Sequence, residues 1–186
     1  MRIISGKLKG KTIDYLKNLT TRPLKNAVRE NIFNILNHSN LININLNNSN
    51  ILDLYSGIGS FGLECISRGA TKVTFVEQNQ EAAYILKKNI NNLSISNQTN
   101  IINDKIENFL QSTCDENFNI FFLDPPFVDK NFIQNLFLIK RKKFFRKKHI
   151  IIIHREKNTE DDLKKTIDII LIKQYGRSKI IFGVFN

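Results

Sequence analysis

From residue 50 onward the chain alternates apolar runs with segments of helical periodicity, and this alternation limits the possible folds more than any other feature. Strands are predicted at residues 51–54, 72–76, 99–102, 119–123, 149–154, 167–173 and 179–185. Helices are predicted between them, at residues 61–68, 80–92, 105–111, 132–140 and 160–164. Such an alternation is typical of an α/β fold around a mostly parallel sheet.

The loop between the last two predicted strands fixes their relative direction. Only residues 174–178 separate these strands. A parallel connection needs a crossover of about a dozen residues or more, so the two strands must pair antiparallel. The sequence therefore predicts a Rossmann-like, seven-stranded, mostly parallel sheet whose last strand is antiparallel.

The first 49 residues differ from this pattern and are predicted to form a separate N-terminal part. Residues 1–16 contain two short strand patterns around Gly6, which predicts a hairpin. Between residues 26 and 37, apolar side chains recur at helical spacing, which predicts an amphipathic helix. The Asn-rich stretch 38–50 is interpreted as a linker. We therefore expect an N-terminal appendage at 1–49 and the main domain at 50–186.

The sequence ILDLYSGIGSFG places glycines where the first strand of the main domain turns into a helix. Glycine lets the backbone approach a ligand closely and exposes the N–H groups of a helix start. Gly57, Gly59 and Gly62 also fit the G-x-G-x-x-G pattern, so this turn alone leaves an NAD-type cofactor open. Asp53 favours an adenosyl cofactor that carries an ammonium and a sulfonium, because a carboxylate would repel a pyrophosphate.

Further polar side chains follow the next two predicted strands. Glu77 ends the strand in VTFVEQN, where a carboxylate can accept hydrogen bonds from ribose hydroxyls. Asn103 and Asp104 follow the third strand, where an adenine amino group can be recognised. Because the carboxyl ends of parallel strands meet at one edge of the sheet, we expect one cleft there. A helix cap is the alternative interpretation for each residue.

The stretch FFLDPPF, residues 121–127, is expected to bring a rigid turn into the same cleft. Pro125 and Pro126 fix their own φ and have no N–H group. Carbonyl oxygens and the Asp124 carboxylate can therefore face the cleft without a backbone donor capturing them. Phe127 adds a flat ring beside these acceptors. A proline-terminated strand end at the surface is the alternative interpretation.

Together these motifs resemble the class I S-adenosylmethionine-dependent methyltransferases, and more closely the RsmD family of 16S rRNA guanine-N2 methyltransferases. The likeness covers nearly the whole chain and rests on MRIISGKLKGKTI, TRPLKNAVRENIFNIL, DLYSGIGSFGLECISRGA, VTFVEQN, DPPF and YGRSKIIF. The pair Lys25-Asn26 departs from the residues that the family usually has ahead of V-R-E.

The resemblance implies S-adenosyl-L-methionine as the cofactor and gives roles to individual residues. The implied cofactor-binding residues are Asp53, Tyr55, Ser56, Gly57, Gly59, Glu77, Asn103 and Asp104, and the implied catalytic residues are Asp124, Pro125, Pro126 and Phe127. Asp124 and the Pro125 carbonyl would hold the N–H groups of the guanine amine, and Phe127 would stack on the base.

The charge of the chain favours a polyanionic partner. Its 28 Lys and Arg against 17 Asp and Glu give a net charge of +11, which suits RNA better than a membrane because no long apolar run is present. Candidates for RNA contact are Arg2, Lys7, Lys9, Lys11, Arg22 and Arg29. The run KRKKFFRKK, residues 140–148, is either a second RNA-binding patch or a solvated face with two core phenylalanines. We expect the partner to be 16S rRNA or an assembling small ribosomal subunit.

Other classes of protein remain as alternatives. A DNA adenine-N6 methyltransferase has a similar tetrapeptide, and a non-catalytic RNA-binding module could keep the same fold. An NAD-dependent oxidoreductase fits the glycine spacing. Protein glutamine methylation fits less well, because neither the charge nor Asp124 in place of the usual Asn suits it.

The cysteines, the histidines and the N-terminal stretch indicate no metal site, no catalytic histidine and no targeting segment. Cys65 and Cys114 form no metal-binding pattern, so no metal site is expected. The three histidines, His38, His149 and His154, are scattered, and none is expected to act in catalysis. The basic N-terminal stretch has no continuous apolar segment, so we expect a cytoplasmic protein, which we take to be a monomer.

Overall fold

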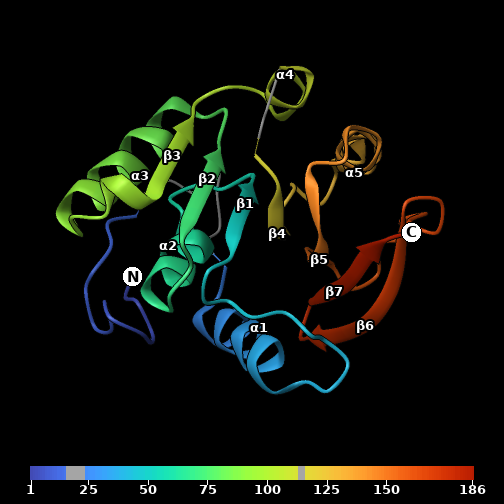
Figure 1. Ribbon diagram of the computed structural model, residues 1–186, viewed down its shortest axis with the longest axis horizontal. Helices are drawn as coiled ribbons and strands as arrows, with labels where there is room; N and C mark the ends of the chain where they lie inside the picture. The colour runs from blue at the N-terminus through green and yellow to red at the C-terminus, as the bar shows by residue number, and fades with distance from the viewer. Residues whose placement is uncertain (16–23, 113–115) are drawn as a thin grey trace.

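The structure of the protein, a computed structural model, describes residues 1–15, 24–112 and 116–186. Within these residues the centre is a seven-stranded sheet in the order β3-β2-β1-β4-β5-β7-β6 (Figure 1). The strands are β1 (Asn50–Leu54), β2 (Lys72–Val76), β3 (Thr99–Ile102), β4 (Phe118–Leu123), β5 (Phe145–Glu156), β6 (Ile167–Tyr175) and β7 (Ser178–Phe185). The helices are α1 (Asn26–His38), α2 (Ser60–Ser67), α3 (Gln80–Asn92), α4 (Ile106–Gln111) and α5 (Asn131–Lys142), and a 3-10 helix, η1 (Ser96–Gln98), follows α3.

The directions of the strands confirm the predicted α/β sheet. Strands β1 to β5 run parallel to one another, whereas β7 lies antiparallel between β5 and β6. From β1 the chain first continues to β2 and β3 on one side, and then returns to β4 and β5 on the other. Ligands of such sheets bind beside the carboxyl ends of the strands, at the point where the order reverses, which here lies between β1 and β4.

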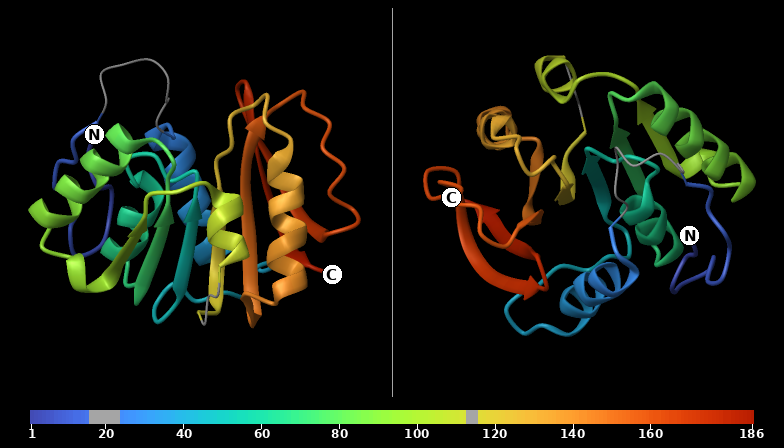
Figure 2. Two further views of the ribbon diagram at one scale, coloured as in Figure 1. Left: turned by 90° about the horizontal axis from the view of Figure 1, so that it is seen from above. Right: turned by 180° about the vertical axis from the view of Figure 1, so that it is seen from behind.

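Helices cover both faces of the sheet, because the strands are apolar on both sides (Figure 2). Helices α1, α2 and α3 pack in one hydrophobic cluster, and α4 and α5 pack in the other. On the first face the rings of Phe33, Phe61 and Phe122 stack in sequence, with centroids 5.3 and 4.1 Å apart, and join α1 and α2 to β4. Ile3 and Ile13 belong to the same cluster, so the N-terminal segment shares the core of the sheet. The division at residue 49 stays a prediction.

The predicted N-terminal hairpin forms in outline, because one isolated antiparallel bridge joins Arg2 to Thr12. Its ladder is short within the described residues 1–15, where the N–H groups of Ile3 and Ile13 donate to the carbonyls of Lys11 and Met1. The N–H groups of Ile4 and Ser5 donate to the Glu64 carboxylate, at 2.8 and 2.9 Å. The segment therefore docks on α2 as an irregular loop.

Two other predictions differ from the structure. The helix expected at 160–164 is wrong, because residues 157–166 form turns and irregular backbone. Asp161 instead pairs with Arg155 at the end of β5. Strand β5 is also longer than predicted, because it begins at Phe145, inside the basic run. The other predicted strands and helices lie within one or two residues of those observed.

Candidate active site

Carboxylates and amides gather where the parallel strands of the sheet end. Asp53 lies near the end of β1, Glu77 follows β2, Asn103 follows β3, and Asp124 follows β4. The strand registers bring these ends to one edge of the sheet, as the sequence predicts. The edge includes the reversal point between β1 and β4, where an α/β sheet binds its ligands.

Asp53 is a buried carboxyl group, 1% exposed, at the centre of this edge. One of its oxygens accepts a hydrogen bond from the N–H of Gly62, in the first turn of α2, at 3.0 Å. Burial raises the pKa of Asp53 well above its ordinary value, and the nearby charges of Asp124 and Glu77 raise it further, while the Gly62 bond lowers it. Because a cation nearby would stabilise the ionised form, this site is suited to a positively charged ligand.

The turn between β1 and α2 has the backbone that its glycines permit. Tyr55, Gly57 and Gly59 have φ of 58°, 54° and 80°, in the left-handed region. A Cβ on Gly59 would lie 2.4 Å from Cδ1 of Leu86, so α3 packs tightly behind the turn. Within the described residues, the buried Oγ of Ser56 has no hydrogen-bond partner. A ligand with a hydrogen-bonding group fits the turn, because it would satisfy this hydroxyl.

Glu77 joins the glycine turn to the neighbouring strand ends. Its Oε2 accepts from the N–H of Gly57 at 2.7 Å, and its Oε1 accepts from the N–H of Asn79 at 2.8 Å. The side chain of Asn103 donates to the Glu77 carbonyl at 2.7 Å. Each carboxylate oxygen has a further lone pair, so these bonds leave acceptor capacity for ribose hydroxyls.

Asp104 lies at the surface, and within the described residues its side chain bonds only to neighbouring residues of the chain. Its Oδ1 accepts from the N–H of Lys105 and from Nδ2 of Asn108, both at 2.7 Å. The N-cap residue of α4 is Lys105, and α4 has no side-chain capping bond, so the helix-cap interpretation of Asp104 is not borne out. Its contact with adenine stays a prediction.

The Asp124 carboxylate lies beside a histidine that the sequence did not single out. Nδ1 of His154 is 2.8 Å from Oδ1 of Asp124, and the two side chains are 14% and 24% exposed. Among the described residues, Oδ2 of Asp124 has no hydrogen-bond partner. Phe127 is 40% exposed, and its ring meets the His154 ring edge-on, with centroids 5.7 Å apart.

The turn that follows Asp124 is held by the buried guanidinium of Arg155. Its Nη1 donates to the Pro126 carbonyl at 3.1 Å, and its Nη2 donates to the Phe127 carbonyl at 3.0 Å. The expectation that no backbone donor captures the carbonyls of this turn is wrong for Pro126, which also accepts from the N–H of Asp129 at 2.8 Å, whereas the Phe127 carbonyl is taken by the Arg155 side chain. The same bonds fix the direction of the Phe127 backbone. Pro125 is buried, and the role of its carbonyl stays a prediction.

Tyr55 links the glycine turn to the segment after the proline turn. Its hydroxyl donates to Oδ2 of Asp129 at 3.0 Å and accepts from Nδ2 of Asn135, on α5, at 3.2 Å. Burial is the main cause that raises the pKa of Tyr55, so the hydroxyl remains a donor. The two halves of the candidate site are thus held together by this side chain.

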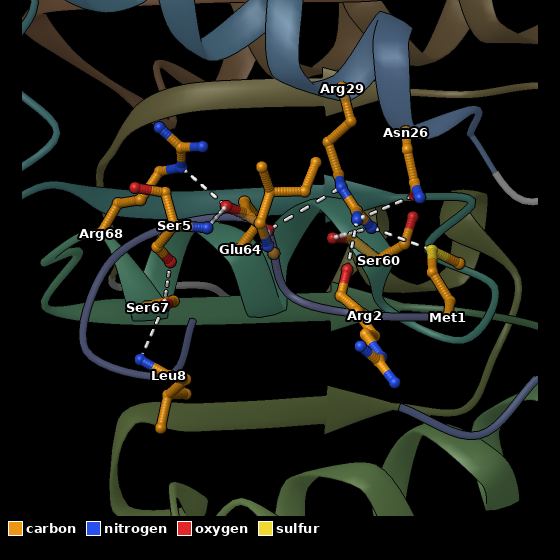
Figure 3. A network of polar contacts seen from close by, with 12 residues as sticks. Met1, Arg2, Ser5, Leu8, Asn26, Arg29, Ser60, Glu64, Ser67 and Arg68 are labelled. Atoms are coloured by element: carbon orange, nitrogen blue, oxygen red, sulfur yellow. Dashed lines mark hydrogen bonds and ion pairs between the residues drawn. The ribbon is translucent and has the colours of Figure 1, made fainter. Parts of the chain in front are cut away.

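Of the residues expected to contact RNA, Arg29 is wrongly predicted, because its side chain is 0% exposed (Figure 3). Its Nη2 donates to the Arg2 carbonyl at 2.7 Å, and its Nε lies 3.8 Å from the buried Glu64 carboxylate. Arg29 therefore holds the N-terminal segment against α1 and α2. The side chains of Arg2, Lys7, Lys9 and Lys11 are exposed, whereas Arg22 lies outside the described residues.

The basic run 140–148 lies away from the candidate site. It spans the end of α5 and the start of β5, whereas Asp124 contacts the far end of β5. Phe144 is buried, and Phe145 packs against Phe185 with ring centroids 4.8 Å apart. The observed packing agrees with the interpretation that the two phenylalanines belong to the core.

His154 and Arg155 are the residues that the sequence reasoning missed. They follow the apolar run 150–153 directly, in a strand that pairs parallel with β4, so they lie at the same edge as Asp124. Polar residues after a buried parallel strand could have identified them. In the part of the chain that the structure describes, no cluster of His, Cys, Asp and Glu is arranged to hold a metal ion, and no helix is long and apolar enough to span a membrane.

The strand order, the reversal point and the acidic strand ends define a class I S-adenosylmethionine-dependent methyltransferase. The family described as "Conserved hypothetical protein 95" matches residues 1–184, and the chain belongs to this family, to which the RsmD proteins also belong. The resemblance to the RsmD family and the assignment of S-adenosylmethionine are thereby confirmed, and an NAD-type cofactor is ruled out.

Individual relatives agree with this assignment. The chain is 35% identical over 155 residues to "Ribosomal RNA small subunit methyltransferase D" of Buchnera aphidicola subsp. Acyrthosiphon pisum (strain APS), covering 83% of this chain and 78% of that protein. It is 30% identical over 185 residues to the protein of the same name from Buchnera aphidicola subsp. Baizongia pistaciae (strain Bp), covering 100% and 91%. A solved structure, "Putative methyltransferase yhhF from Escherichia coli", has a TM-score of 0.84 and 25% identity, covering 98% of this chain and 96% of that chain.

Proposed function

We propose that the protein transfers a methyl group from S-adenosylmethionine to the exocyclic N2 amine of a guanine in small-subunit rRNA. The observation that carries the proposal is the Asp124 carboxylate, which is fixed through one oxygen and has the other open at the edge that holds Asp53 and Glu77. Relatives that share 30–35% of their residues with this chain are named small-subunit rRNA methyltransferases.

An exocyclic guanine amine is a weak nucleophile, because its lone pair is delocalised into the ring. Oδ2 of Asp124 can accept one N–H of this amine, which favours a pyramidal nitrogen and directs its lone pair. When bound, the cofactor supplies an activated methyl group on a sulfonium. Asp124 then takes up the proton that the amine loses, so no strong base is needed before the transfer.

Phe127 supports this chemistry as the surface on which the target base stacks. The ring is 40% exposed, although a buried ring would be more stable in the free protein. Its backbone is fixed by Arg155, and its edge contacts His154. A base that leaves its RNA helix or loop can be held on such a ring.

The partner in this proposal is 16S rRNA, either free or in an assembling small subunit, in the cytoplasm. The net charge of +11 favours the phosphate backbone, and exposed Arg2, Lys9 and Lys11 add cations on the N-terminal segment. Arg29 is left out, because it is buried.

The test is methyl transfer from labelled S-adenosylmethionine to 16S rRNA and to small subunits from a strain that lacks the gene. Wild type should label one guanine, identified by mapping the modified nucleotide, and Asp124→Asn should reduce labelling at least 100-fold. Asp162→Asn, at an exposed carboxylate outside the site, is the control for the fold. Labelling of adenine in double-stranded DNA instead of rRNA would overturn the proposal in favour of a DNA methyltransferase.

A further inference from the structure

We propose that His154 is a positioning residue for the methyl transfer: its Nδ1–H donates to Oδ1 of Asp124 and so turns Oδ2 of Asp124 toward the guanine amine. This inference rests on the proposed function, because it describes how the acceptor of that reaction is held.

The sheet itself brings the two side chains together. Leu123 and Ile153 are register partners on β4 and β5, and Asp124 and His154 are the next residues of the two chains. Their side chains meet at 2.8 Å, and both are largely shielded from solvent. A hydrogen bond to an ionised group in such a place is stronger than one in water.

The surroundings of His154 leave it one polar partner. On the other side of β5 its register partner is the buried Ile180 of β7, and the ring of Phe127 lies against the imidazole. The adjacent Arg155 directs its guanidinium to Asp161 and to the proline turn. Within the described residues, Asp124 is thus the only hydrogen-bond partner of the His154 side chain.

A carboxylate that is free to rotate presents either oxygen in many directions. A donor on Oδ1 fixes the carboxylate plane and leaves the lone pairs of Oδ2 in a defined direction. In the transfer, the guanine nitrogen forms a bond to the methyl carbon, while the carbon–sulfur bond breaks with its electron pair on sulfur. The nitrogen then loses one proton to Oδ2 of Asp124, and His154 keeps the proton on Nδ1.

Two variants separate positioning from proton transfer. His154→Asn keeps a donor, because Nδ2 of asparagine and Nδ1 of histidine are separated from Cα by the same number of bonds, but the amide does not titrate. His154→Leu has no donor. Single-turnover rates on the rRNA substrate should fall about 10- to 100-fold in His154→Leu and stay within about 3-fold of wild type in His154→Asn. The affinity for S-adenosylmethionine, measured by calorimetry, should be the same in both. His38→Leu, at the exposed end of α1, is the control.

A double-mutant cycle then identifies the partner. In an Asp124→Asn background, His154→Leu should cause little further loss, because the oxygen that it positions no longer carries charge. A His154→Leu variant as fast as wild type would overturn the proposal. So would a His154→Asn variant as slow as His154→Leu, because the histidine would then act by moving a proton.

A third measurement does not depend on the RNA substrate. If wild type labels no RNA, the proposed function fails, and nitrogen NMR of the imidazole at about pH 8 still tests the hydrogen bond. The hydrogen is expected on Nδ1 of His154. A hydrogen on Nε2 alone would overturn the inference.

Discussion

Arg155 and Asp161 form a bidentate ion pair inside the protein, with Nε 3.0 Å from Oδ2 and Nη2 3.2 Å from Oδ1. The side chains are 0% and 2% exposed, and the guanidinium also lies over the ring of Phe132, 4.5 Å from its centroid. Through the carbonyls of Pro126 and Phe127, the same guanidinium fixes the turn that follows Asp124. The pair therefore connects the loop before β6 to the candidate site.

Asp161→Ala should be strongly destabilising, because it leaves a buried guanidinium without its counter-charge. Breaking a buried pair of this kind costs about 3–5 kcal/mol of unfolding free energy. Urea unfolding measures the change, and Asp162→Ala, which alters the exposed neighbouring residue, is the control. Equal stability of the two variants would show that the pair contributes nothing to folding.

A second buried carboxylate, Glu64, holds the N-terminal segment (Figure 3). It accepts from the N–H groups of Ile4 and Ser5 and pairs with Arg68 at 2.8 Å. Glu64→Ala removes all these acceptors, so we expect a loss of about 3–5 kcal/mol and faster hydrogen exchange at Ile4 and Ser5. Exchange is followed by mass spectrometry.

The control for Glu64→Ala is Asp14→Asn, which removes the exposed pair between Asp14 and Lys88. An exposed pair contributes little, so this variant should unfold and exchange like wild type. If Ile4 and Ser5 keep their protection in Glu64→Ala, the segment is held by its apolar contacts alone.

The contribution of Asp53 to the free energy of unfolding should fall as pH rises. Burial raises its folded-state pKa above the unfolded value, so folding favours the protonated carboxyl. The contribution is fully present below the unfolded pKa, near 4, and is lost as pH rises through the folded pKa. Asp53→Asn keeps an acceptor for Gly62 but does not titrate. The difference in unfolding free energy, wild type minus Asp53→Asn, should decrease from about pH 4 upward; a flat difference would contradict the shift.

The sequence predicts the sheet well, because apolar strands that are buried on both faces leave a continuous hydrophobic run. Prediction from the sequence fails where a contact with a residue distant in the chain overrides the local structural preference. Residues 160–164 have helical composition, yet Asp161 turns to the buried Arg155. Arg29 sits on the polar side of an amphipathic pattern, yet Glu64, which is distant in the sequence, draws it into the interior. His154 was missed for the same reason, since its partner lies on the neighbouring strand.

The N-terminal cations should contribute unequally to RNA binding. The N-terminal segment runs along α2, from the carboxyl ends of the strands, where Asp124 lies, toward their amino ends. The Arg2 carbonyl meets Arg29, which also contacts Ser60 at the start of α2, whereas the N–H of Lys7 donates to Ser67 at its end. Lys7 also donates to Gln98, just before β3. Eight residues of helix, about 12 Å, thus separate Arg2 from Lys7, and Arg2 is on the side of Asp124.

Arg2→Gln should therefore weaken binding of a 16S rRNA fragment more than Lys7→Gln does. Both variants remove one positive charge and keep a polar side chain, so each serves as the matched control of the other. Fluorescence anisotropy at several salt concentrations measures the affinity. For Arg2→Gln, the slope of log affinity against log salt should become shallower by about 1, the value for one lost phosphate contact. A larger change for Lys7→Gln would place the RNA on the opposite edge of the sheet, away from Asp124.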